Sequence, residues 1–142
     1  MKIYEDAGDF YKAADEYHQL GMLAQEQRQF NQAISYYPKA LGVYEKFQDW
    51  YRTSLTLAKL GKVLEAQSNF SQALAIYIHG LAIGIKHYQE FIEVFIYLLA
   101  GMLQTLGENE FDAIWRELTG SECVGEWRKA IWAARDRLDE DI

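Results

Sequence analysis

Proline and cysteine are almost absent from this sequence. Its 142 residues contain one proline, Pro38, and one cysteine, Cys123. A single cysteine excludes an internal disulfide, a Cys-x-x-Cys motif and a zinc site built from thiolates, and it is typical of a reducing compartment. The lack of proline, together with an apolar share of 50%, favours long helices over a turn-rich β-sandwich or a disordered chain. We therefore expect an all-α domain.

Positive charge and long apolar runs are also scarce. The 14 basic residues are outnumbered by 21 acidic ones, giving a net charge of -7, and no stretch gathers basic and aromatic residues on one face. Such a chain repels a phosphate backbone, so we expect no nucleic-acid partner. The most apolar segment, residues 91–106, is too short for a membrane span and contains Glu93, and residues 1–6 lack the apolar run of a secretory signal. We expect no membrane contact and a cytoplasmic location.

Sequence motifs of catalysis are missing. There is no Walker loop, no Gly-x-Gly-x-x-Gly, no Gly-x-Ser-x-Gly and no His-Glu-x-x-His. His18, His79 and His87 lie too far apart along the chain for a local metal site, which would need the fold to gather other ligands. Cys123 has no basic neighbour to lower its pKa, which favours a structural thiol over a nucleophile. We expect no enzyme activity, no metal and no cofactor.

The sequence does contain an internal repeat with a period of forty residues. This shift aligns Gly21 with Gly61 and Gly101, and likewise Ala33 with Ala73 and Ala113. Between the first two copies it also aligns Tyr4 with Tyr44, Asp9 with Asp49, Tyr11 with Tyr51, Leu20 with Leu60, Phe30 with Phe70, Gln32 with Gln72 and Tyr37 with Tyr77. One register kept over so many positions indicates repeated copies of one structural unit.

Each unit is predicted to contain two helices. Apolar residues step by three and four, as in Leu57, Leu60 and Leu64, and short polar breaks follow, where Asn69 and Asn109 can cap the next helix. The predicted helices are residues 10–27, 30–47, 50–67, 70–87, 90–106, 109–118 and 122–138, with residues 2–7 as the tail of an earlier helix. Pro38 falls inside one of them, where it costs about 3 kcal/mol or kinks the helix.

The period alone would also suit a HEAT-like repeat, so the small residues are needed to distinguish the families. Tyr17-x-x-Leu20-Gly21-x-x-Ala24 is followed by Ala33-x-x-x-Tyr37, and Leu57-x-x-Leu60-Gly61-x-x-Leu64 by Ala73-x-x-x-Tyr77. Both stretches resemble the signature of the tetratricopeptide repeat family. The third copy, Tyr97-x-x-Ala100-Gly101 with Ala113, is weaker, because Gln104 and Glu117 replace apolar or aromatic residues. The resemblance implies a right-handed α-solenoid in which each signature glycine faces an alanine of the partner helix. The forty-residue period resembles arrays attached to bacterial signal-transduction ATPases.

The resemblance extends over residues 3–120, and we expect one domain over residues 1–142 with repeat units at 10–48, 50–88 and 90–120. A final helix at 122–138 should cap the last unit through one apolar stripe. That stripe consists of Val124, Trp127, Ile131, Ala134 and Leu138. Since residues 3–5 align with 43–45, we expect the chain to be the C-terminal part of a longer array.

Members of this family usually bind protein segments in a concave groove lined by the first helix of each unit. Counted from the signature glycines, the groove residues are Asp15, His18, Met22, Gln25 and Glu26 in the first unit and Leu55, Ala58, Lys62, Glu65 and Ala66 in the second. They lack the Lys, Asn and Arg pattern that binds chaperone tails, and their charges suit a segment with some positive charge. The corresponding positions in the third unit form an apolar floor that consists of Phe95, Leu98, Met102 and Thr105. This floor could accept a helix from a partner or the chain's own C-terminal helix, and we favour the latter.

We predict a non-catalytic protein-interaction module, part of a larger regulatory or signalling protein. The partner is a protein or peptide. A self-association domain is the alternative, because exposed flanks of the third unit or the N-terminal end could pack against a second copy.

Overall fold

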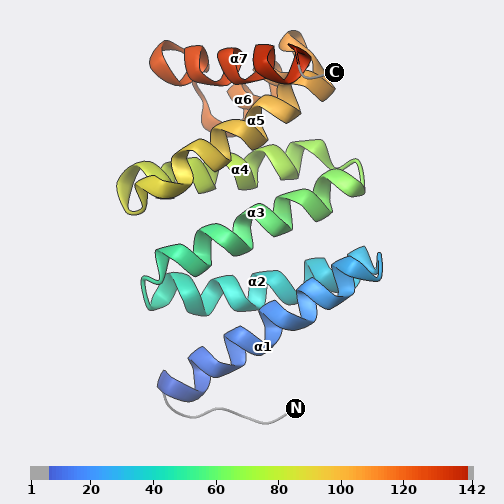
Figure 1. The fold of residues 1–142 in the computed structure, drawn as a ribbon, viewed down its shortest axis with the longest axis vertical. Helices are drawn as coiled ribbons and strands as arrows, with labels where there is room; N and C mark the ends of the chain where they lie inside the picture. The colour runs from blue at the N-terminus through green and yellow to red at the C-terminus, as the bar shows by residue number, and fades with distance from the viewer. Residues whose placement is uncertain (1–6, 141–142) are drawn as a thin grey trace. The chain divides into compact units, whose positions relative to one another are not determined.

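The computed structural model describes residues 7–140, and all regular structure in this range is helical (Figure 1). The predicted all-α repeat fold is therefore confirmed. The chain divides into two compact units, Met1–Asn69 and Phe70–Ile142. The helix tail predicted over residues 2–7 lies outside the described residues, apart from Ala7, which begins the first helix.

The first unit contains three consecutive helices, α1 (Ala7–Glu26), α2 (Phe30–Lys46) and α3 (Trp50–Ala66). Their bounds lie within three residues of the sequence prediction. Each helix reverses direction relative to the one before it, and α2 packs against both α1 and α3 (Figure 1).

Left-handed residues, and not glycines, terminate α1 and α2. Arg28 has a φ of 59° and Gln48 a φ of 57°, and this conformation turns the chain back after each helix. The residue after the left-handed one then donates a hydrogen bond to the end of the preceding helix. After α2, the Asp49 N–H donates to the Tyr44 carbonyl at 3.0 Å. The Asp49 carboxylate also caps α3 by accepting a hydrogen bond from the Arg52 N–H at 3.0 Å.

The close contact between α1 and α2 is made by a glycine and a tyrosine. A Cβ atom added to Gly21 would lie 2.6 Å from the Tyr37 ring, whose side chain is fully buried. The predicted neighbour Ala33 is also fully buried, but the three atoms nearest to the added Cβ all belong to Tyr37. Gly21 is needed because an aromatic ring, and not a methyl group, occupies the space above it.

Pro38 lies inside α2 without interrupting it. The helix continues from Phe30 to Lys46, and Pro38 is exposed. Exposure lets water hydrate the Ile34 carbonyl, which lacks the N–H that another residue at position 38 would provide.

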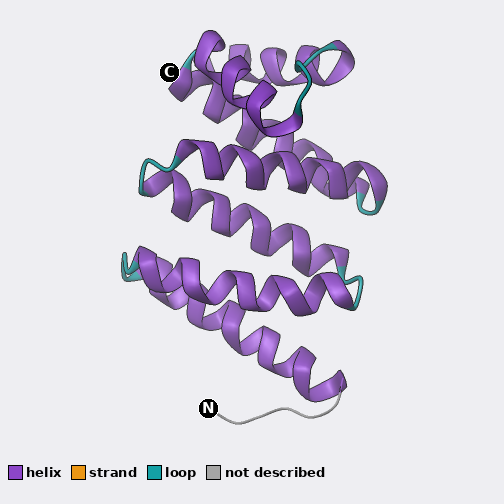
Figure 2. Ribbon diagram, turned by 180° about the vertical axis from the view of Figure 1, so that it is seen from behind, coloured by secondary structure: helices purple, strands orange, loops and turns teal. Residues whose placement is uncertain are grey.

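The second unit contains α4 (Phe70–Lys86), the 3₁₀ turn η1 (Gln89–Phe91), α5 (Ile92–Leu106), α6 (Glu108–Thr119) and α7 (Gly125–Glu140), joined by short loops (Figure 2). Asn109 does not cap α6 as predicted, because the helix has already begun at Glu108 and Gly107 is at the cap position. The last helix begins three residues later than predicted, at Gly125, whose φ of 71° is left-handed.

The third repeat departs from the pattern of the first. A Cβ atom at Gly101 would meet no atom within 4 Å, so the expected close contact is missing there. α5 instead packs more extensively against α7 than against α6. The tight contact in this unit involves Gly80 of α4, where an added Cβ atom would lie 2.2 Å from the ring of Phe95.

The apolar floor predicted on α5 is closed. Phe95, Leu98 and Met102 are buried, whereas Thr105 is exposed and donates its hydroxyl proton to the Gly101 carbonyl. The chain itself buries these residues: Phe95 packs against Gly80 of α4, while α7 lies against α5 beside Ile96 and Tyr97. Direct cover of Phe95, Leu98 and Met102 by the C-terminal helix stays a prediction.

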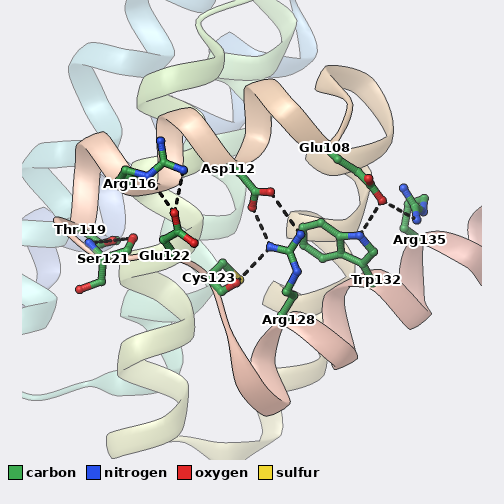
Figure 3. Close-up of polar contacts among 10 residues, drawn as sticks. All are labelled: Glu108, Asp112, Arg116, Thr119, Ser121, Glu122, Cys123, Arg128, Trp132 and Arg135. Carbon is green, nitrogen blue, oxygen red and sulfur yellow. Dashed lines mark hydrogen bonds and ion pairs between the residues drawn. The ribbon is translucent and has the colours of Figure 1, made fainter.

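A polar network joins α6 to α7 (Figure 3). The Arg128 guanidinium donates to both carboxylate oxygens of Asp112, at 2.8 and 3.2 Å, and to the Cys123 carbonyl at 3.0 Å. It also lies 3.8 Å from the ring centre of Trp132, whose indole N–H donates to Glu108 at 2.8 Å. This network fixes the orientation of α7 relative to α6 within the unit.

The predicted capping stripe on α7 is only partly correct. Ile131 and Ala134 are buried and Leu138 is half-buried. Val124 and Trp127 are exposed, by 64% and 37%, because Val124 precedes the helix and Trp127 lies in its first turn.

Candidate functional site

The α1 and α3 helices of the first unit enclose a pocket of about 340 Å³. Its lining consists of Asp15, His18, Gln19, Met22, Tyr44, Tyr51, Arg52 and Leu55. The predicted groove residues Asp15, His18, Met22 and Leu55 are thus brought together. The other four were not predicted, because Tyr44 comes from α2 and the rest fall outside the family's groove positions. A pocket of this volume holds one long side chain.

One wall of the pocket is an acidic and aromatic network around Arg52. The Arg52 Nε atom lies 3.5 Å from Asp15 Oδ1, and its Nη1 atom lies 3.1 Å from Asp49 Oδ2 and donates to the Tyr11 hydroxyl at 2.8 Å. Asp15 Oδ1 also accepts a hydrogen bond from the Tyr44 hydroxyl. Side chains from all three helices therefore fix Asp15 and Arg52 in place, and two carboxylates balance the one guanidinium.

A second hydrogen-bond chain fixes the protonation pattern of His18. Its Nδ1 atom lies 2.8 Å from Thr56 Oγ1, which in turn lies 2.7 Å from the Arg52 carbonyl oxygen. A carbonyl only accepts, so the single hydroxyl proton of Thr56 must point to Arg52. Thr56 then accepts from His18 Nδ1–H, and the neutral ring has a lone pair on Nε2.

The surroundings of His18 keep it neutral. Burial is the main cause that lowers its pKa below 6.5, and the nearby positive charge of Lys59 adds to this effect. The His18 ring lies 5.8 Å from the ring of Tyr37 and 6.4 Å from that of Tyr44. Burial raises the pKa of both tyrosines, to about 12 for Tyr37, so both are uncharged as well.

The remaining predicted groove residues do not line this pocket. Gln25 accepts a hydrogen bond from the Tyr37 hydroxyl at 2.6 Å and so is engaged by α2. Glu26 lines a separate pocket of about 310 Å³ along α1. On α3, Ala58 and Glu65 are half-buried, whereas Lys62 and Ala66 are exposed. A binding role for these residues stays a prediction.

The second unit has a pocket of its own, lined mainly by apolar side chains. It has a volume of about 380 Å³ and lies between α5 and α7. Its lining consists of Glu93, Ile96, Tyr97, Ala130, Ala133, Ala134, Arg137 and Leu138. Cys123 is buried elsewhere in this unit, and burial raises its pKa to about 11, which keeps the thiol protonated.

The described residues contain neither a metal-binding cluster nor a helix that could span a membrane. No three His, Cys, Asp or Glu side chains in residues 7–140 gather closely enough to hold a metal ion. Within the same range, every helix is too short or too polar to cross a membrane.

Comparison with known families decides the identity of the repeat. A model of the tetratricopeptide repeat family matches residues 12–86, which is over half of the chain. The chain belongs to the tetratricopeptide repeat family. No curated protein and no solved structure matches it. The matched residues end with α4, before the part of the chain in which Gly101 lacks its close contact.

Membership of the tetratricopeptide repeat family implies a scaffold for protein–protein interaction. Domains of this family are generally non-catalytic.

Proposed function

We propose that this tetratricopeptide repeat domain binds a segment of another protein along the surface formed by α1 and α3, as a module of a larger regulatory protein. The observation that supports this proposal is the pocket in which Asp15 and His18 of α1 lie opposite Leu55 of α3. Hydrogen bonds to Tyr44 and Thr56 hold the two polar residues before any partner arrives.

Such pre-organisation favours binding because fewer side chains lose freedom when the partner docks. The half-buried Met22 and Leu55 side chains offer apolar contact, and the fixed polar atoms give specificity. Exposed charge pairs add only about 0–1 kcal/mol each. We therefore expect modest affinity that decreases with salt concentration.

The test is to capture binding proteins with the wild-type domain and with a Met22→Glu, Leu55→Glu variant. Asp15 is unsuitable for this purpose, because its replacement would release Tyr44 and Arg52. A matched control with the same added charge is Gln32→Glu, Ser35→Glu, at two exposed positions of α2.

We expect the pocket variant to lose proteins that both the wild type and the control retain, with all three equally folded by circular dichroism. The same set of proteins on all three would contradict the assignment of this surface.

Self-association is a second candidate, and it is favoured by exposed apolar residues beside the α5–α7 pocket. Tyr97 is 57% exposed and Val94 is 39% exposed on α5. Sedimentation of the wild type and of Tyr97→Lys at several concentrations tests this. A concentration-dependent mass that the substitution lowers would support self-association, and a constant monomer mass would exclude it.

A further inference from the structure

We propose that the α1–α3 pocket accepts a lysine side chain of the bound protein, whose ammonium group donates hydrogen bonds to His18 Nε2 and to Asp15 Oδ2. This inference rests on the proposed function and specifies the chemical group that the pocket recognises.

The first argument is that His18 presents an acceptor. The Thr56 hydroxyl donates its proton to the Arg52 carbonyl. The hydrogen bond between Thr56 and His18 must therefore be donated by the ring N–H of His18. The Nε2 atom of His18 has no hydrogen-bond partner among the described residues. The buried side-chain atoms that lack a partner there are in Thr53 and Ser54, so Nε2 is exposed to solvent. A ligand that meets His18 there must supply a proton.

The second argument is that Asp15 presents another acceptor on the same side. Its Oδ1 atom accepts a hydrogen bond from Tyr44 and pairs with Arg52. Its Oδ2 atom has no partner within residues 7–140, and the Asp15 side chain is 44% exposed. Asp15 and His18 are three residues apart on α1, which places them on one helix face. The pocket therefore combines two adjacent acceptors, one of them anionic.

A lysine ammonium can satisfy both acceptors, since it has three donors and no acceptor. A carboxylate has no proton to donate. A carboxamide has donors on its nitrogen, but its carbonyl oxygen is an acceptor and cannot pair with either atom. The aliphatic part of a lysine can lie along Met22 and Leu55, which line the same pocket.

Local charge does not oppose the ammonium. Arg52 is the only cation lining the pocket, and it is held by the carboxylates of Asp15 and Asp49. The negative charges of Asp15 and Asp49 offset the positive charges of Arg52 and of Lys59, which also acts on His18, so these groups leave no net positive charge beside the pocket. The whole chain is also acidic, with a net charge of -7, which attracts a basic segment.

Acidification should weaken the interaction, because a protonated His18 has no lone pair and repels the ammonium. The charged groups that act on His18 are Asp15 on α1 and Lys59 and Arg52 on α3, while Tyr37 and Tyr44 on α2 stay neutral. Binding should therefore decrease as the pH falls from above 6.5 through the lowered pKa of His18.

The experiment uses Nα-acetyl-lysine methylamide as the probe and the norleucine analogue, which lacks the ammonium, as its control. Binding to the wild type and to both His18 variants is followed by NMR through the methyl signal of Met22, which lines the same pocket. In the wild type, the ring nitrogen shifts of His18 also report which nitrogen carries the proton. We expect Nδ1–H in the free protein and a saturable shift with the lysine amide only. His18→Phe should weaken lysine-amide binding about tenfold, as for one lost charged hydrogen bond. His18→Gln, which keeps an acceptor, should lose less.

A proton on Nε2 of the free protein, or equal responses to the lysine and norleucine amides, would overturn the lysine assignment. A stronger response to Nα-acetyl-arginine methylamide would overturn it too. These results are distinct from failure of the proposed function, which the capture experiment with Met22→Glu, Leu55→Glu measures independently of lysine.

Discussion

Replacing Gly80 by alanine tests the packing of the second unit. The new Cβ atom would lie 2.2 Å from Phe95 Cε1, whereas carbon atoms pack favourably at about 3.5–4.0 Å. Phe95 is fully buried, so its ring cannot move aside without displacing its neighbours. Such overpacking costs about 1–3 kcal/mol, and the better helix propensity of alanine returns at most about 1 kcal/mol. We expect a net loss of about 1–2 kcal/mol, or a decrease in melting temperature of about 3–8 °C.

The matched control is Gly42→Ala on α2. Gly42 is exposed, and no atom lies within 4 Å of its added Cβ, so only the propensity gain of up to about 1 kcal/mol applies. Stability is measured by urea titration followed by circular dichroism, with hydrogen exchange to locate the effect, because repeat arrays do not always unfold in one step. In a Gly80→Ala, Phe95→Leu double variant, the smaller side chain should make the combined loss less than the sum of the single losses. If Gly80→Ala is as stable as Gly42→Ala, the packing argument is wrong.

Four further substitutions or measurements have expected outcomes. Pro38→Ala should raise the free energy of unfolding by about 1–3 kcal/mol, because α2 is continuous and regains a backbone hydrogen bond; an unchanged urea midpoint would contradict this. A double-mutant cycle with Arg128→Ala and Asp112→Ala should give a coupling free energy of about 1 kcal/mol, because the pair is only partly buried; a value of zero would show that the bridge adds nothing. Because folding lowers the pKa of His18, the unfolded chain takes up the proton first, so the wild type should lose stability relative to His18→Gln as the pH falls below 6.5; parallel pH curves would refute the shift. Iodoacetamide should alkylate Cys123 far more slowly in the native protein than in urea, because the thiol is buried and its pKa is about 11; equal rates would place it at the surface.

The helices could be predicted because their signals are local. Apolar spacing and polar breaks gave bounds within three residues for every helix described. The repeat register also identified the family, because Gly21 and Tyr37 keep their spacing in the second copy as Gly61 and Tyr77. Periodicity suffices for this purpose, since each helix must bury one stripe against its neighbours.

The candidate site was only partly predictable. Counting from the signature glycines found Asp15 and His18, because the groove positions implied by the family resemblance keep a fixed spacing from those glycines. The count missed Tyr44 and Arg52, whose side chains reach the pocket from α2 and from the first turn of α3. No sequence spacing predicts a hydrogen bond between residues that are far apart along the chain.

The sequence by itself determined the helical period, the repeat length and the family, all of which depend on residues close together in the chain. Tertiary packing decided what each signature residue touches. Gly21 accommodates the ring of Tyr37, whereas Gly101, in the same repeat position, meets nothing because α5 packs mainly against α7. The same packing set the proton position on His18, through Thr56 of α3. A contact depends on which surfaces meet after the helices assemble, and identical residues in a repeat need not meet identical neighbours.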